Sequence, residues 1–227
     1  MNTLIIACRT IADELNMIVK KIDCNYPILW IDSGLHNFPE LLRKRLQEEL
    51  NHISNVDQVI LVFGFCGNSL LGITAPNYKL IFPRVDDCIT LLLGSCQKRK
   101  EISDEMGTYF LTKGWLDYET NIWVEYQATV KKYGKTKADR IFKAMLQHYE
   151  RLAVVETGAY NLDAFIEKTK LIANDLKLTH QVVPGELRYM KKLLIGPWDE
   201  EFVVIQPGET VALSHIHSEV LKPVKSL

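Results

Sequence analysis

Short apolar runs and segments of helical periodicity alternate along the first hundred residues of the chain. The apolar runs have the length and β-branched composition of strands and stand at residues 3–8, 26–32, 59–63 and 79–82. Residues 59–63 are apolar at every position, which is typical of a central strand covered on both faces. The alternation of strand and helix predicts an α/β protein with a doubly wound, Rossmann-like parallel sheet.

The second half repeats this pattern after a helical interruption. The predicted elements are a strand at 108–112, helices at 119–132 and 137–149, and strands at 152–156, 178–183 and 202–206 with helical segments between them. We therefore predict two α/β units joined by a helical pair. The first unit spans residues 1–116, the helical connection 117–150, and the second, smaller unit with a tail 151–227.

Composition and charge exclude several classes of partner. The chain has 227 residues, of which 47% are apolar, and a net charge of -1, so it offers no basic footprint for nucleic acid. No apolar run reaches the roughly eighteen residues that span a bilayer, and the amino terminus lacks the cationic region of a signal peptide. We expect a cytoplasmic protein with no nucleic-acid or membrane partner. Five cysteines, an odd number, favour thiols or metal ligands over disulfides.

Three cysteines follow predicted strands at the point where each strand turns toward a predicted helix. Cys8, Cys66 and Cys88 occupy these positions, and His36 lies on the loop after the second strand. Loops at the carboxyl ends of parallel strands share one edge of the sheet, so these side chains are candidates for a single cleft. A thiolate at a helix amino terminus is stabilised by the helix dipole, which makes it a better nucleophile and metal ligand.

Cys8, Cys66, Cys88 and His36 form the predicted set of metal ligands. Thiolate and imidazole ligands suit zinc or an iron–sulfur cluster, whereas magnesium prefers carboxylates. No C-x-x-C or C-x-x-H spacing is present, so the metal hypothesis depends on topology alone. The three thiols can reach one ion if the first, third and fourth strands are neighbours in the sheet.

A small-molecule ligand is also predicted, with Gly67, Asp86 and Tyr160 as candidate contacts. Tyr160 follows the strand at 152–156 in the second half, where it could help to bind an anionic or polar ligand. Asp86 either orients a ligand or favours the start of the helix that follows it. Cys66 is also the candidate catalytic nucleophile, because residues 63–67 resemble a nucleophile elbow in outline, although G-x-S-x-G is not present. The alternative for all three thiols is that they pack as small apolar side chains.

Several short motifs form a distinctive combination along the chain. They are Cys8 at the end of the first strand, D-S-G-L-H at 32–36, G-F-C-G at 64–67, P-R-V-D-D-C at 83–88 with L-L-G-S at 92–95, and T-Y-F-L-T-K-G-W at 108–115. Together they resemble a family of uncharacterised proteins, the domain of unknown function numbered 1638. The resemblance covers most of the chain and implies a role near one-carbon metabolism, because members occur in methanogens and anaerobic bacteria, often beside corrinoid methyltransferase systems. The D-x-H-x-x-G pattern with which many corrinoid proteins hold cobalt is not present, so a corrinoid is expected on a partner protein.

Three functional hypotheses follow from the sequence. The first is a metalloprotein whose thiols bind zinc or an iron–sulfur cluster, acting in or beside corrinoid-dependent methyl transfer with a corrinoid protein or methyltransferase as partner. The second is a non-enzymatic accessory or ligand-binding module for a methyltransferase, in which the cysteines only pack. The third is an enzyme that uses Cys66 as its nucleophile.

Overall fold

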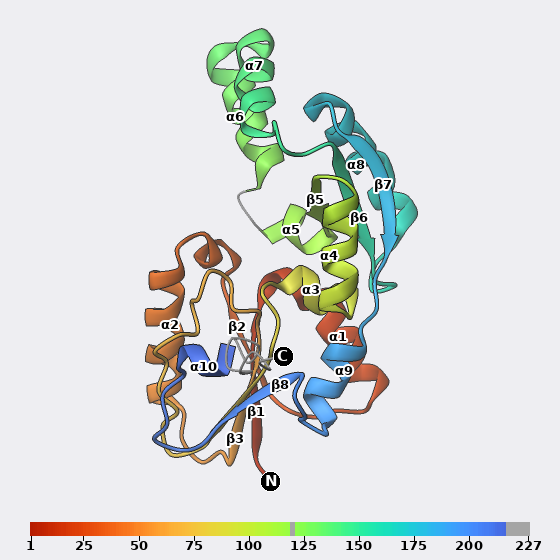
Figure 1. The fold of residues 1–227 in the computed structure, drawn as a ribbon. Coiled ribbons are helices and arrows are strands. Elements are labelled where there is room, and N and C mark those ends of the chain that lie inside the picture. Colours follow the sequence, from red (N-terminus) through yellow and green to blue (C-terminus); the bar gives the residue numbers. More distant parts are fainter. Residues whose placement is uncertain (119–120, 217–227) are drawn as a thin grey trace, which may run out of the picture.

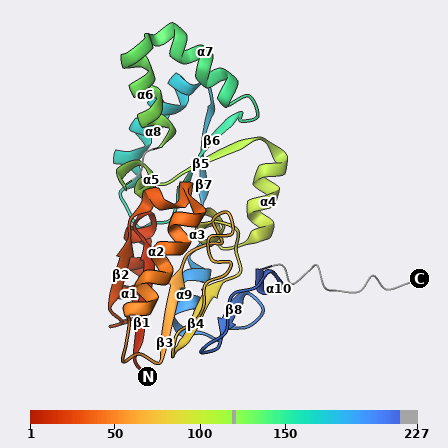
Figure 2. The ribbon, with the colours of Figure 1, turned by 90° about the vertical axis from the view of Figure 1, so that its left-hand side faces the viewer.

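Two separate sheets, each with its own helices, form the computed structural model of the protein, which describes residues 1–118 and 121–216 (Figure 1). We call the larger sheet with its helices the first unit and the smaller sheet with its helices the second unit. The second unit stands on the carboxyl edge of the first sheet (Figure 2). The α/β, Rossmann-like class expected from the sequence is confirmed.

The first unit is built on a five-stranded sheet in the order β2-β1-β3-β4-β8. Its strands are β1 (Thr3–Cys8), β2 (Ile28–Ile31), β3 (Gln58–Val62), β4 (Lys79–Pro83) and β8 (Phe202–Ile205). β1 to β4 are parallel, with Ile60 of β3 aligned with Ile5 of β1 and with Ile81 of β4, and β8 is antiparallel to β4. The first, third and fourth strands are thus neighbours, which is the order that the metal hypothesis requires.

The second unit is built on a three-stranded parallel sheet in the order β5-β6-β7. Its strands are β5 (Thr108–Leu111), β6 (Arg151–Glu156) and β7 (Thr179–Pro184). Between β5 and β6 the chain forms α5 (Lys113–Tyr118), α6 (Ile122–Tyr133) and α7 (Lys135–Met145), and α8 (Leu162–Leu176) connects β6 to β7. α6 and α7 pack against each other at the end of the molecule furthest from the first sheet (Figures 1 and 2).

The remaining helices cover the two faces of the first sheet or join it to the second unit. They are η1 (Arg9–Ile11), α1 (Ala12–Lys21), η2 (Ser33–Asn37), α2 (Pro39–His52), α3 (Cys88–Leu93), α4 (Cys96–Glu105), α9 (Arg188–Ile195) and α10 (Leu213–Ile216). Successive residues of a strand face opposite sides of its sheet, so Ile5 packs with Leu15 of α1 and Leu193 of α9, whereas Ile6 packs with Leu46 of α2. Among the described residues, no helix has both the length and the apolar character of a membrane span.

Two strands belong to the opposite sheet from the one we predicted. We placed residues 108–112 in the first unit and 202–206 in the second, but β5 pairs with β6, and β8 pairs with β4. Apolar periodicity identifies a strand without specifying its partner, and here β8 covers the edge of β4. The first unit is therefore made from both ends of the chain, and the second is inserted between them. Residues 119–120 of the helix predicted at 119–132, and residues 217–227 of the predicted tail, lie outside the described residues.

Helix α5 packs directly on η1, where the two units meet. Gly114 allows this contact, because a Cβ atom at that position would overlap the backbone of Thr10. Beside it, Lys113 Nζ donates to Asp13 Oδ2 at 2.8 Å and forms an ion pair with Asp117 Oδ2 at 2.9 Å. The junction thus combines close backbone packing with charged contacts from both units.

A buried carboxyl group lies in the same junction. Thr157 Oγ1 of the second unit donates to Glu14 Oε1 at 2.9 Å, and Glu14 Oε2 has no hydrogen-bond partner among the described residues. Glu14 is only 1% exposed, and this burial raises the pKa of its carboxyl group to about 6. The ionised form of Glu14 is therefore costly in the folded protein.

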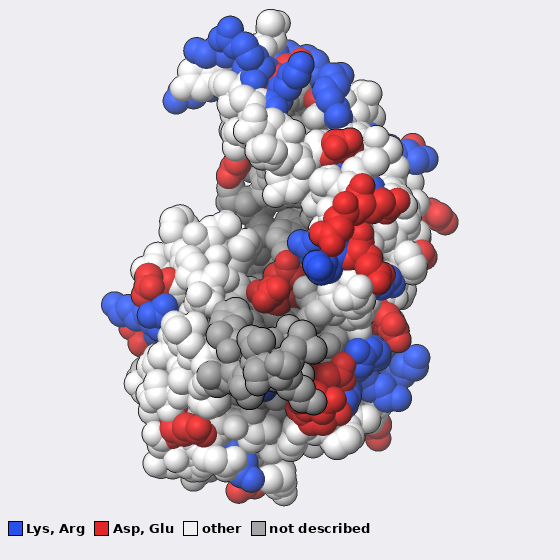
Figure 3. Space-filling model, viewed as in Figure 1, with Lys and Arg blue, Asp and Glu red and all other residues white. Residues whose placement is uncertain are grey.

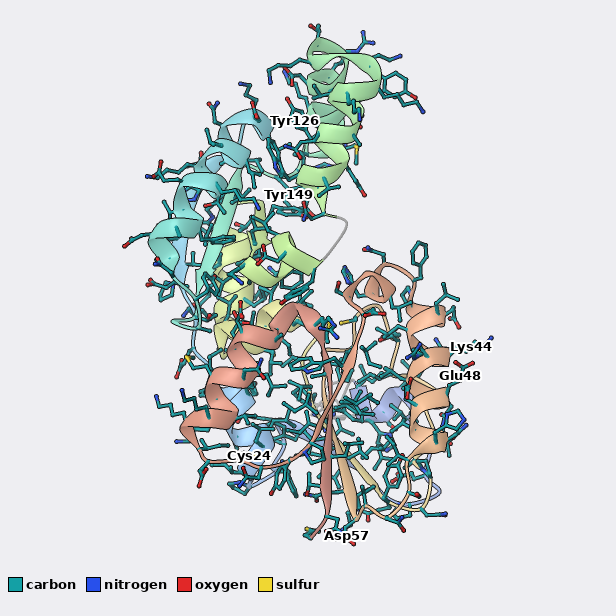
Figure 4. All side chains as sticks on the ribbon, turned by 180° about the vertical axis from the view of Figure 1, so that it is seen from behind. Cys24, Lys44, Glu48, Asp57, Tyr126 and Tyr149 are labelled. Atoms are coloured by element: carbon teal, nitrogen blue, oxygen red, sulfur yellow. The ribbon has the colours of Figure 1, made fainter. Side chains whose placement is uncertain are left out.

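Protonation of Glu14 should make the stability of the protein depend on pH. The ordinary pKa of 4.5 applies in the unfolded chain and about 6 in the folded one, so between these values the folded state binds more protons. The free energy of unfolding should fall by about 2 kcal/mol as pH rises through this window. Urea unfolding at several pH values measures this slope. Glu14→Gln should remove it, and Glu48→Gln, on the outer side of α2 (Figure 4), should not; a slope that survives in Glu14→Gln would contradict the assignment.

Candidate functional site

A cavity of about 230 Å³ lies at the carboxyl edge of the first sheet, beneath the second unit. Its lining is mainly apolar. Four predicted metal ligands and one predicted ligand contact line it together, namely Cys8, His36, Cys66, Cys88 and Gly67. We call it the thiol cavity. The convergence of strand ends at one edge of a parallel sheet accounts for this grouping.

Cys66 lies on a tight turn after β3 and is partly exposed. Its backbone N–H donates to the carbonyl of Asp86 at 2.9 Å, so the segment after β3 runs beside the segment after β4. Gly64 permits this approach, because a Cβ atom there would stand 2.5 Å from the Cα atom of Asp87. The helix expected after Cys66 is absent from residues 64–78, since Cys66, Gly67 and Asn68 all have positive φ angles, which a right-handed helix cannot contain.

Cys88 is the first residue of α3, and Asp87 caps this helix by accepting from the backbone N–H of Thr90 at 2.7 Å. The helix dipole should lower the pKa of a thiol at this position. Instead, the hydrogen bond with the Cys66 thiol, followed by burial, raises the pKa of Cys88 well above its usual range. Cys66 and Cys88 are thus a pair of interacting thiols, and Cys88 is held in its protonated form.

Cys8 and His36 reach the thiol cavity from neighbouring loops. The sulfur of Cys8 lies 3.0 Å from the hydroxyl oxygen of Thr10, and Cys8 is 6% exposed. His36 Nδ1 lies 2.8 Å from the carbonyl oxygen of Ser33. Because a carbonyl only accepts, Nδ1 carries the proton of this bond, and the neutral imidazole then has its lone pair on Nε2.

Two of the predicted ligand contacts lie elsewhere. Asp86 is exposed and contributes its carbonyl group to the bond with Cys66, while the neighbouring Asp87 lines the thiol cavity. Tyr160 belongs to the second unit, where its hydroxyl donates to the carbonyl of Val155 and its ring packs edge-on against Phe165. Of the three predicted ligand contacts, only Gly67 lines the thiol cavity. The sequence did not show that Asp87, and not Asp86, would line it.

The remaining cysteines stand apart from the thiol cavity. Cys24 lies between α1 and β2, at the amino edge of the first sheet (Figure 4). Cys96 begins α4 and is exposed. Both are useful controls for the three cavity thiols.

Trp115 lines the thiol cavity and was not among the candidate residues. It belongs to α5 of the second unit, which packs on η1 at the carboxyl edge of the first sheet. The sequence offered one signal for Trp115 as a cavity residue, namely a large aromatic side chain shortly after a predicted strand and directly after a glycine. Its place over the cavity depends on how the two units meet, which periodicity does not encode.

The side chains that line the thiol cavity lie near one another, but they do not surround a common point as the ligands of a metal ion do. Within residues 1–118 and 121–216, no group of three or more His, Cys, Asp or Glu side chains has the spacing of a metal site. The arrangement offers a pair of interacting thiols, a third thiol and an imidazole in a mainly apolar enclosure. Such a set can bind a thiophilic ion after side-chain rotation, or present a thiol nucleophile.

Comparison with known proteins identifies a family but no characterised relative. No curated protein and no solved structure matches the chain. The model of the family described as Protein of unknown function (DUF1638) matches residues 30–194. His36, Cys66 and Cys88 lie within this span, and Cys8 precedes it. Because the match covers well over half of the chain, the protein belongs to the DUF1638 family.

Proposed function

We propose that the thiol cavity binds a thiophilic metal ion, zinc by preference, and that the bound metal serves methyl transfer in or beside a corrinoid-dependent system. One observation carries the metal proposal: Cys8, Cys66 and Cys88, from three neighbouring strands, open into one cavity together with His36. Sulfur and imidazole nitrogen are the donors that zinc prefers. The methyl-transfer part comes from the family resemblance.

Cys66 and Cys88 are the proposed primary ligands. Their direct interaction supports this role, because two ligands of one ion must lie close together. Zinc binds thiolates, so binding would release the protons that the pair now holds. Affinity should therefore rise with pH, and the raised pKa of Cys88 extends this rise to higher pH.

Cys8 and His36 complete the proposed set. Zinc–sulfur bonds of about 2.3 Å in a tetrahedral site bring sulfurs to roughly 4 Å from one another, so the sulfur of Cys8 would lie at about this distance from those of Cys66 and Cys88 on binding. The bond from His36 Nδ1 to Ser33 supports Nε2 as the ligand atom, since an imidazole ligand commonly donates its other N–H to a carbonyl.

Zinc fits this lining better than an iron–sulfur cluster does. Four thiolates commonly hold a cluster of two or four irons, whereas three thiols and one imidazole match a common zinc site. The described lining offers three thiols.

Metal analysis of anaerobically purified protein tests the proposal. We expect about one zinc per chain in the unaltered protein and a loss of at least tenfold in zinc affinity in Cys66→Ser/Cys88→Ser, because two of four ligands are removed. The matched control is Cys24→Ser/Cys96→Ser, which removes two thiols outside the cavity and should keep the metal. Equal and negligible metal in all three proteins would overturn the proposal and favour an accessory module in which the cysteines only pack.

A second candidate function is nucleophilic catalysis by Cys66. The observation that favours it is the backbone of Cys66, whose φ of 42° is strained for a residue with a side chain, on a turn between Gly64 and Gly67. Such strain concentrates at functional positions. Iodoacetamide should then label Cys66 of the metal-free protein faster than Cys24, which is similarly half-buried. Labelling of Cys66 at or below the rate of Cys24 would count against this function.

A further inference from the structure

A second, wider cavity of about 520 Å³ lies between the two units, beside the thiol cavity. The first unit contributes η2 and Phe38 to its walls, and the second unit contributes Tyr109, Trp115 and the start of α6. His36 and Trp115 line both cavities, so the two are neighbours that share part of their walls. We call the wider part the aromatic cavity.

Aromatic rings from both units line the aromatic cavity. Phe38, Tyr109 and Trp115 are among its lining residues, and Phe38 is 60% exposed, a high value for a phenylalanine. An exposed aromatic side chain at the rim of a cavity is a common feature of ligand sites, since rings provide a large contact area with little conformational freedom to lose.

The Asp and Glu side chains that line this space differ in whether a basic partner lies beside them. Asp32 and Asp87 line the thiol cavity and are paired with Arg9 at 3.9 Å and Arg99 at 3.5 Å, whereas Glu125 lines the aromatic cavity. Among the described residues that line the two cavities there is no Lys or Arg. Figure 3 shows a hollow between the units, and the largest group of Lys and Arg side chains lies away from it, at the outer end of the second unit. In the aromatic cavity, Glu125 is therefore a counter-charge for a cation, and no Lys or Arg of the described lining is one for a phosphate or carboxylate.

We propose that the aromatic cavity binds an organic cation of the quaternary or methylated ammonium class. The faces of aromatic rings attract a cation through their quadrupoles, and this attraction is the usual means of recognising methylated ammonium groups. A bare metal ion is a poorer occupant, because His36 and Glu125 are the only His, Cys, Asp or Glu residues among the described residues that line the aromatic cavity. A methylated ammonium group needs no such ligands, since its charge is spread over its methyl groups. The inference goes beyond the metal site and does not depend on it.

Choline and its uncharged isostere 3,3-dimethylbutan-1-ol form a matched pair of probes. They have nearly the same shape, and the nitrogen that carries the charge is replaced by carbon. Titration of the full chain by calorimetry, with tryptophan fluorescence as a second signal, should show that choline binds at least tenfold more tightly than the isostere. Phe38→Leu and Glu125→Gln should each weaken choline binding several-fold, because one removes a ring and the other a charge.

Tyr133→Leu is the control for Phe38→Leu, because Tyr133 is also an exposed aromatic residue, at 46%, and it lies at the end of α6 outside both cavities. It should leave choline binding unchanged. Equal binding of choline and its isostere, or no binding of either, would overturn the proposal, and so would choline binding that Phe38→Leu and Glu125→Gln leave intact. Cys66→Ser/Cys88→Ser should retain choline binding, so a failure of the metal proposal is distinguishable from a failure of this one.

Discussion

Gly114→Ala should lower the free energy of unfolding by about 3 kcal/mol, the upper end of the cost of overpacking a well-packed site. The added methyl group would overlap the carbonyl oxygen of Thr10, which is backbone and cannot move aside without shifting η1. Alanine is a better helix former than glycine, by about 1 kcal/mol, so any destabilisation must come from this contact between the units. Urea unfolding monitored by circular dichroism measures the effect.

Gly34→Ala is the matched control for this steric prediction. A Cβ atom at Gly34 meets nothing within 4 Å, so the same added methyl group should change stability by less than about 0.5 kcal/mol. Equal effects of the two substitutions would show that α5 does not pack on η1 in solution as described. The Gly114 variant should also reduce zinc binding if the thiol cavity depends on the second unit above it.

Arg151→Met should destabilise the second unit by about 3 kcal/mol, the upper end of the value of hydrogen bonds to a charged group. The Arg151 side chain is 4% exposed, and its guanidinium donates to Thr108 Oγ1 at 3.0 Å, to Gln181 Oε1 at 2.7 Å and to the carbonyl of Ile102 at 2.6 Å. Methionine donates nothing, so acceptors from α4, β5 and β7, of which Thr108 is buried, lose their partner at once.

Arg140→Met provides the comparison, because Arg140 is exposed on α7 and its replacement should change stability by less than about 0.5 kcal/mol. Thermal unfolding followed by circular dichroism distinguishes the two variants. A loss of stability in Arg151→Met no larger than in Arg140→Met would contradict the bonding described for β5, β6 and β7.

The sequence predicted the features that depend on local pattern and on parallel-sheet topology. Uniformly apolar residues 59–63 indicated a central strand, and β3 lies between β1 and β4. Placing Cys8, Cys66 and Cys88 after strands was enough to predict that they share an edge, and they line one cavity with His36. Whether these residues bind a metal stays a prediction.

Features that depend on long-range pairing or on backbone conformation were not predictable in the same way. β8 reaches β4 across more than a hundred residues, and nothing in its apolar pattern distinguishes that edge from the edge of β7. The helix expected after Cys66 was wrong because consecutive positive φ angles interrupt the backbone there. The effect of the helix dipole on Cys88 was outweighed by a neighbouring thiol and by burial, which only the fold brings together.

The return of β8 to the first sheet determines the order in which the protein can assemble on the ribosome. The inserted unit has all three of its strands once residue 184 has emerged, whereas the larger sheet lacks its last strand until residue 205. During that interval the edge of β4 is open to pairing with other chains. The second unit should therefore fold first, and the nascent first unit should be the part most in need of chaperone protection.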